Sequence, residues 1–330
     1  MRHRDRFRKR LSHSFRMRTG ALVLALFALA AVFAEFLAAD APVVAWGDRG
    51  VVVLPAVFRP AAYPSREAAE ERHKNDTAIW PLVRYGPNSV SEPSVGMSLA
   101  HPLGTDMHGR DLYARLVHGA RAALLLAVAA LLFAVVFGSL LGAFAGYVGG
   151  FWDEVVARPA ELVETFPAIV VVAVVRAVYP DQAVWSLAVA VAAVRWAEIA
   201  RLVRAEVIRF GGAEFVEAAR ALGSSHLRVL RHHILPHALR PVIVTALFAV
   251  PSIVLLEAAV SFLGFGVRGS WGVMLAEAAS GNWRAPLCAV LALGALVGAS
   301  YLLADAVGEA LDARVAAASR SAWWARGKKA

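Results

Sequence analysis

Residues 211–241 read GGAEFVEAARALGSSHLRVLRHHILPHALRP, a polar stretch that interrupts two long apolar runs. Four apolar residues in its first part recur at the spacing of one helix face: Phe215, Ala218, Ala219 and Leu222. Gly223 is expected to end this short helix, because glycine turns the backbone sharply without steric cost. The pattern therefore predicts a short amphipathic helix that ends at a corner.

A second short helix is expected after this corner, and Pro236 is expected to end it, because proline cannot continue helical hydrogen bonding. The bent pair is too polar and too short to cross a bilayer. It predicts a surface elbow, residues 211–241, that presents an apolar knob to a partner. The alternative is a loop that only connects two membrane helices, but such a connector needs neither the apolar stripe nor the Gly and Pro corners.

Three pieces of this elbow, Glu217-Ala218-Ala219, Gly223 and Ile234-Leu235-Pro236, resemble the EAA signature of the membrane subunits of ABC importers. In that family the loop lies in the cytoplasm, docks into a groove of the ATP-hydrolysing subunit and carries its motion to the membrane helices. The resemblance implies a coupling role for eight residues: Glu217, Ala218, Ala219, Gly223, His233, Ile234, Leu235 and Pro236.

The composition of the chain is that of a membrane protein. Of its 330 residues, 59% are apolar, with a mean hydropathy of +0.58, whereas soluble domains average about 45–50% apolar. The net charge of +9 gathers in the first twenty positions, in 201–240 and in the tail, and basic clusters mark the cytoplasmic side of membrane proteins. Nucleic-acid binding is the rival interpretation of a basic chain, and the hydropathy argues against it. A single cysteine, Cys288, excludes an intrachain disulfide.

The first apolar run, residues 21–40, follows an arginine-rich segment, 1–20, and has about the ~20 residues needed to cross a bilayer. A signal peptide is the alternative, since Ala39-Asp40-Ala41 imitates a cleavage site. We favour an uncleaved helix with its basic N-terminus inside, because the run is long for a signal peptide. Residues 41–117 are rich in proline and are expected outside, with a short strand at 51–54 and a helix at 65–74.

An ABC transmembrane domain is expected over residues 118–312, followed by a cytoplasmic tail, 313–330. It contains five more predicted spans, at about 122–147, 152–179, 182–201, 241–265 and 286–307. The sequence thus predicts an all-α polytopic membrane protein with six transmembrane helices and both termini in the cytoplasm.

Two local patterns refine these spans. Gly138, Gly142 and Gly146 form a small-residue stripe of the kind that lets helix backbones pack closely. Pro167 is expected to kink the third span where its purely apolar part begins.

Two further stretches resemble one branch of ABC permeases, the C-type partner in dipeptide, oligopeptide and nickel importers. They are His101–Asp106 with Gly109-Arg110-Asp111, and Glu257–Gly266 with Ser270–Leu275. Together with the elbow, the resemblance covers roughly 97–314 and implies the type I (MetI-like) ABC importer permease fold.

Within these stretches, Glu257 and Ser261 are candidates for the translocation path, because a carboxylate deep in a membrane helix usually has a function. The alternative is a hydrogen-bonded glutamate that locks two helices together. His101, Asp106 and His108 lie at irregular spacing on a loop, so we expect no metal site there.

The sequence contains no G-x-x-x-x-G-K-[ST] run to hold nucleotide phosphates and no catalytic cluster. We therefore expect a non-catalytic transport subunit that binds no cofactor itself. The resemblance implies its partners in the inner (plasma) membrane: two ATP-binding subunits that hold ATP and Mg²⁺, a second related permease, and an external solute-binding protein. No nucleic acid is expected among them.

Short peptides are the expected solute, although nickel, opines, glycosides and a peptide antibiotic fit the same branch. A secondary transporter or channel driven by an ion gradient is a different class of function. It would need ionisable residues along a path and would leave the elbow unexplained. A membrane-embedded enzyme would need a catalytic cluster at one interface, which the sequence lacks.

Overall fold

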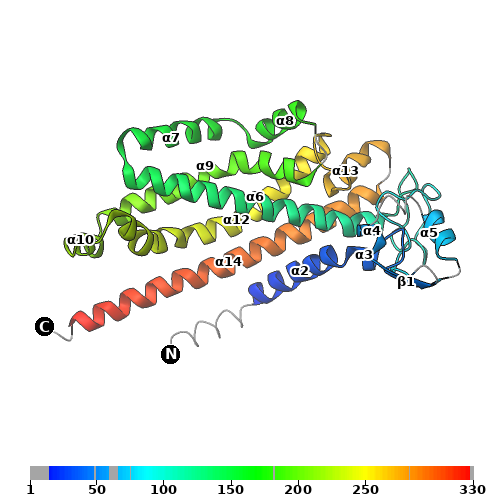
Figure 1. Cartoon of the computed structure of the whole chain (residues 1–330), viewed down its shortest axis with the longest axis horizontal. Coiled ribbons are helices and arrows are strands. Elements are labelled where there is room, and N and C mark those ends of the chain that lie inside the picture. Colours follow the sequence, from blue (N-terminus) through cyan, green and yellow to red (C-terminus); the bar gives the residue numbers. More distant parts are fainter. Residues whose placement is uncertain are drawn as a thin grey trace.

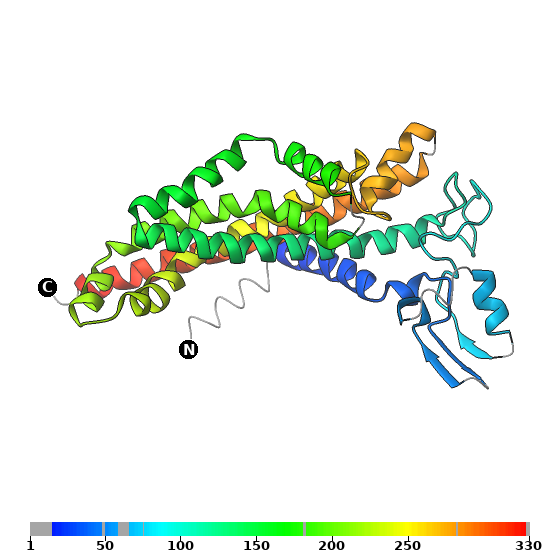
Figure 2. The ribbon, with the colours of Figure 1, turned by 45° about the horizontal axis from the view of Figure 1, so that its top comes forward.

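The computed structural model describes residues 15–327 except for 48–49, 59–65, 75, 181–182 and 282. Long helices run side by side and form one elongated bundle (Figure 1). A small module with short strands lies at one end of the bundle, and α10 lies at the other end (Figures 1 and 2). The fold is therefore helical throughout the part expected to lie in the membrane.

Four helices among the described residues are long and apolar enough to cross a membrane. They are α2 (Phe15–Val32), α6 (Leu112–Val148), the continuous run His226–Phe262, and the Arg284–Leu311 part of α14 (Arg284–Gly327). The all-α membrane class is thereby confirmed. The two other predicted spans correspond to α7 with α8 and to α9 (Val184–Gly211), so the count of six stays a prediction.

The glycine stripe of α6 packs against the backbone of α9. A Cβ atom added to Gly142 would lie 2.2 Å from the carbonyl oxygen of Ala200. Cβ atoms on Gly138 and Gly146 would each lie 2.7 Å from other carbonyl oxygens of α9. Only glycine permits so close an approach, which confirms the predicted close packing of helix backbones.

The third predicted span is broken rather than kinked. Helix α7 (Gly150–Thr165) ends just before Phe166, and α8 (Ala168–Val178) begins just after Pro167. Phe166 is extended, with φ −93° and ψ 142°, because the ring of a following proline disfavours helical geometry in the residue before it. Two short helices therefore replace the single kinked helix that the sequence predicted.

The prediction that Pro236 ends a helix is wrong, because Pro236 lies in the first turn of α12 (Leu235–Phe262). Helix α11 (His226–Arg228) and the π-helical turn η2 (Val229–Ile234) lead into α12 without interruption. In the widened turn the Leu235 N–H donates to the carbonyl five residues earlier, on Leu230. Such a turn leaves room for a proline ring, which would clash with the carbonyl four residues before it in a regular helix.

The module at the end of the bundle opposite α10, which we call the strand module, is a three-stranded antiparallel sheet with a few short helices. Its strands β1 (Val44–Gly47), β2 (Gly50–Val53) and β3 (Thr77–Ile79) lie in the order β2-β1-β3. The helices are α3 (Ala34–Leu37), α4 (Pro55–Phe58) and α5 (Arg66–Arg72). The sequence predicted the strand that became β2 and the helix that became α5, and the structure confirms both.

A methyl group added to Gly142 should destabilise the bundle. We expect Gly142→Ala to cost about 1–3 kcal/mol, the usual penalty for overpacking, because the α9 backbone cannot move away without disturbing its other contacts. The measurement is the temperature at which half of the detergent-solubilised protein aggregates. Gly294→Ala is the matched control, since no atom lies within 4 Å of a Cβ there. Equal stability of the two variants would contradict the close packing.

Candidate functional site

One face of the elbow is buried against the end of the bundle. Val216 and Ala219 of α10 (Glu214–Ala221) and Ile234 of η2 belong to one buried cluster, which includes Val203 and Val207 of α9. The elbow is therefore packed onto the same helix that the glycine stripe holds.

The other face of the elbow is exposed and apolar. Phe215, Leu222 and Leu227 are 41%, 87% and 73% exposed, and Ala218 is exposed between them. We call these four residues the elbow knob. The predicted stripe placed Ala219 on this face, but Ala219 is buried and Leu227 takes part instead. Exposed apolar side chains gathered on one surface are typical of a site that contacts another protein.

Aromatic and histidine side chains hold the elbow in place. The Phe215 ring contacts the rings of Phe210 and His237, at centroid distances of 6.4 and 5.3 Å. The Tyr147 hydroxyl lies 3.0 Å from Nδ1 of His226, which joins the end of α6 to the start of α11. Tyr147 and Phe210 escaped the sequence analysis, because no local pattern links Tyr147 to a histidine 79 positions away.

The predicted coupling residues divide between the exposed and the packed side of the elbow. Glu217, Ala218, Gly223 and Pro236 are exposed, His233 and Leu235 are partly buried, and Ala219 and Ile234 are buried. Their contact with an ATP-hydrolysing subunit stays a prediction.

Gly223 forms the corner of the elbow with a φ of +78°, in the left-handed region that glycine adopts freely and that strains most residues with a Cβ. No atom would contact an added Cβ there, so only the backbone conformation requires a glycine.

At the opposite end of the bundle, two buried carboxylates pair with two arginines. The Asp106 carboxylate accepts from Nε of Arg110 at 2.7 Å and from Arg115 at 2.6 Å. The Glu277 carboxylate, at the start of η3 (Glu277–Ser280), accepts from the same two guanidinium groups at 2.7 Å each. This network, which we call the Asp106–Glu277 network, joins the loop before α6 to the segment that follows α13 (Trp271–Ala276).

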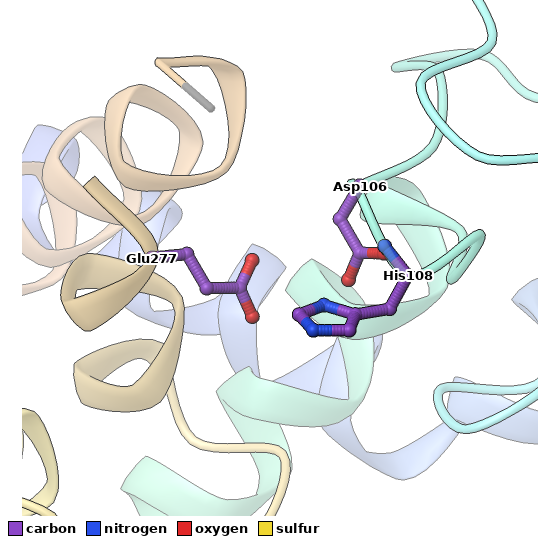
Figure 3. A group of neighbouring side chains, drawn as sticks. All are labelled: Asp106, His108 and Glu277. Atoms are coloured by element: carbon purple, nitrogen blue, oxygen red, sulfur yellow. The ribbon is translucent and has the colours of Figure 1, made fainter. Parts of the chain in front are cut away.

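His108 lies beside this network, and Figure 3 shows its ring between Asp106 and Glu277. One ligand atom from each of the three residues lies within 4.8 Å of the others, close enough for one metal ion. Two guanidinium groups already occupy the carboxylate oxygens, however, and would repel a cation. The arrangement favours a structural ion-pair network, and the expected lack of a metal stays a prediction.

Glu257 and Ser261 are almost completely buried, at 2% and 1% exposure. The Ser261 hydroxyl donates to the Glu257 carboxylate at 2.6 Å, and the other carboxylate oxygen has no hydrogen-bond partner within the described residues. The loop that follows α12 and the start of α13 cover Ser261, since a Cβ on Gly266 would overlap the Ser261 hydroxyl and one on Gly272 would lie 2.6 Å from the Ser261 Cβ. This burial favours the alternative in which the glutamate locks two segments, and a role in the path stays a prediction.

Arg176 in α8 also fixes this loop, although the sequence analysis did not single it out. Its guanidinium donates to the Phe265 carbonyl at 3.0 Å and to the Ser186 hydroxyl at 2.6 Å. A single arginine in an otherwise apolar helix was the available signal. Next to this loop lies a cavity of about 410 Å³, lined by Arg110, Arg115 and Ser261 among others.

Residues 138–317 match the family described as binding-protein-dependent transport system inner membrane component. The dipeptide transport system permease protein DppC of Alkalihalophilus pseudofirmus is 34% identical over 239 residues, which are 66% of this chain and 78% of the relative. DppC of Bacillus subtilis is 31% identical over 69% of this chain and 73% of the relative. The oligopeptide transport system permease protein OppC of Haemophilus influenzae is 36% identical over 54% of this chain and 58% of the relative.

A bulky residue at the corner should loosen the elbow. We expect Gly223→Val to cost roughly 1–2 kcal/mol, because left-handed backbone is strained for a residue with a branched Cβ. Hydrogen exchange of the backbone amides in 214–230 measures the loosening and should become at least about fivefold faster. Gly223→Asn is the control, because asparagine tolerates this backbone conformation. Equal exchange in both variants would show that the corner is not strained.

Removing one arginine from the Asp106–Glu277 network should be strongly destabilising. We expect Arg115→Met to cost about 3–5 kcal/mol, because two buried carboxylates would then share one guanidinium. The half-exposed pair Arg66–Glu70 gives the control, Glu70→Gln, with an expected cost below about 1 kcal/mol. Thermal unfolding in detergent compares the two variants. If added divalent cations raised the unfolding temperature of the unaltered protein, Asp106, His108 and Glu277 would form a metal site, and their assignment to a structural ion-pair network would be wrong.

Proposed function

The chain belongs to the family of binding-protein-dependent transport system inner membrane components, and from that premise we propose that it is the permease subunit of an ATP-driven importer of short peptides. The elbow knob is the observation that carries this proposal. Leu222 and Leu227 are largely exposed in an otherwise polar stretch. Their burial in a groove of a partner would supply binding energy, as apolar anchors do at protein interfaces.

The helix that follows the elbow makes it suitable as a lever. The run His226–Phe262 contains 37 residues, which at 1.5 Å per residue is about 55 Å of continuous helix. It begins beside the elbow knob and ends at the loop that covers Ser261. A push on the elbow would therefore reach the far end of α12 and the loop beyond it. In this mechanism the motion alternates access to the solute between the two sides of the membrane.

Partner subunits would supply the energy for transport by hydrolysing ATP. The sequence contains no nucleotide-binding run, so two ATP-binding subunits would hold ATP with Mg²⁺ and hydrolyse it. A second, related permease would complete the path, and an external binding protein would deliver the solute. The chain itself would carry out no chemical step and bind no cofactor.

The elbow end of the bundle would face the cytoplasm in this arrangement. The C-terminal part of α14 lies at the same end as α10 (Figure 1), and basic residues crowd both the elbow and the chain termini. Both termini would then lie in the cytoplasm, with the strand module outside.

Peptides are the solute that the relatives favour, because two of them are named as dipeptide and one as oligopeptide transport permeases. Nickel, opines, glycosides and a peptide antibiotic have no such support. A transporter driven by an ion gradient is also disfavoured, because it would have no ATP-binding subunit to cover the elbow knob.

A charge placed in the elbow knob should uncouple the transporter. We expect Leu222→Asp to weaken binding of the ATP-binding subunits by at least about 30-fold, the loss of 2 kcal/mol typical of an interface anchor. Co-purification of these subunits measures the loss, and peptide uptake into proteoliposomes should fall with it. The amount of the permease in the membrane should not change.

Leu99→Asp is the matched control, since Leu99 is fully exposed in the loop between β3 and α6, at the opposite end of the bundle from the elbow, and it should leave association intact. The energy source is tested separately by depleting ATP and by adding an uncoupler. Uptake that continued without ATP but stopped with the uncoupler would overturn the proposed function.

A further inference from the structure

Helix α7 has two exposed faces of opposite character. Four polar residues, which we call the α7 polar stripe, lie on one of them at helical spacing: Glu154, Arg158, Glu161 and Thr165. The neighbouring exposed face is apolar and carries Phe151, Val155 and Leu162. The helix buries a third side against the bundle, through Val156 and Ala160.

The remaining charges of α7 point to α9 rather than into the stripe. Asp153 pairs with Arg204, and Glu164 pairs with Arg201. These two ion pairs fix the rotation of α7 about its axis. The polar stripe therefore faces away from α9, and its exposure does not come from a freely rotating helix.

The topology places α7 beside the inner half of the bundle. Gly146 near the end of α6 approaches Arg204, near the end of α9, so α6 and α9 run parallel. The segment that joins the end of α6 to the start of α9 must then travel the length of the bundle. It does so as α7, the break and α8, with α7 next to the elbow end (Figures 1 and 2).

Lipid is a poor environment for the exposed polar side of this segment. A charged side chain at the bilayer centre costs about 2.5–3.5 kcal/mol on insertion scales. The break at Phe166 and Pro167 is exposed as well, and irregular backbone at membrane depth is tolerated only where protein buries it or water reaches it. The apolar face with Leu162 suits lipid, so the two faces meet different surroundings.

We propose that the α7 polar stripe lines the water-filled inner half of the translocation path and attracts protonated amines of the solute. Arg158 lies 3.3 Å from Glu161 and offsets one of the two acids. Glu154 has no ion-pair partner in the described part of the chain, so the stripe retains one negative charge. The ammonium group of a peptide is the matching charge. This inference rests on the proposed function, because it presupposes a path for solute.

Site-directed cysteine labelling tests the position of the stripe. The chain has a single cysteine, Cys288, so a Cys288→Ala background makes every new thiol unique. Arg158→Cys and Thr165→Cys report on the stripe, and Val155→Cys and Leu162→Cys report on the apolar face of the same helix. The probe is a membrane-impermeant maleimide, applied to the assembled transporter in proteoliposomes. Stripe thiols should react at least about tenfold faster, because only the hydrated thiolate reacts.

Labelling with and without nucleotide distinguishes a helix that lines a path from a helix that lies among the lipid headgroups. A path lining predicts that labelling from the elbow side is lost when nucleotide traps the ATP-binding subunits closed. An interfacial helix predicts the same labelling with and without nucleotide, and that result would overturn the proposal. Equal labelling of the two faces would overturn it too.

The charge preference has its own measurement. Thr165→Cys leaves the three charges of the stripe in place, so a cationic thiol reagent should react several-fold faster with it than an anionic one. An anion preference would contradict the expected solute chemistry. Uptake assayed on the same variants keeps the two hypotheses apart: labelling reports on the stripe, whereas ATP dependence of uptake reports on the proposed function.

Discussion

The close contact between α6 and α9 is the constraint on which the other elements depend. Without side chains at Gly138, Gly142 and Gly146, the α6 backbone lies directly against carbonyl groups of α9. The two helices therefore act as one rigid pair. The buried face of the elbow packs on Val203 and Val207 of this pair, and α7 is tied to its arginines. Elements far apart in the sequence thus share one support.

The distribution of charge follows from the same architecture. At the end next to the strand module, Asp106 and Glu277 are buried and their two charges are matched by two guanidinium groups, which fixes the segments there to one another. At the elbow end the charges of the α7 polar stripe stay exposed, and the apolar side chains of the elbow knob are uncovered. The α7 polar stripe and the elbow knob therefore lie at the end where the proposed ATP-binding subunits and solute would bind. Helix α12 connects that end to the loop that follows it.

The sequence predicted features that arise from local patterns or composition. Helical apolar runs indicated the membrane class, the four-residue spacing of glycines indicated close packing, and the elbow was visible as a polar interruption with an apolar stripe. Prediction from the sequence failed where the outcome depended on tertiary contacts. Pro236 entered a helix because a π turn made room for its ring, and Ala219 turned inward because α9 offered a buried surface. Glu277, which pairs with the same two arginines as Asp106, has no signal in its local sequence.

The amino-acid sequence by itself determined that this chain lies in a membrane and carries an elbow but no G-x-x-x-x-G-K-[ST] run, because hydropathy, helix periodicity and short motifs are properties of neighbouring residues. Only the tertiary structure decided which face of each helix is covered. It turned one side of α7 toward α9 and left the other exposed, and it buried Glu257 beside Ser261, which the loop after α12 covers. Burial and ion pairing depend on residues that are brought together across long separations, so the linear pattern alone does not specify them.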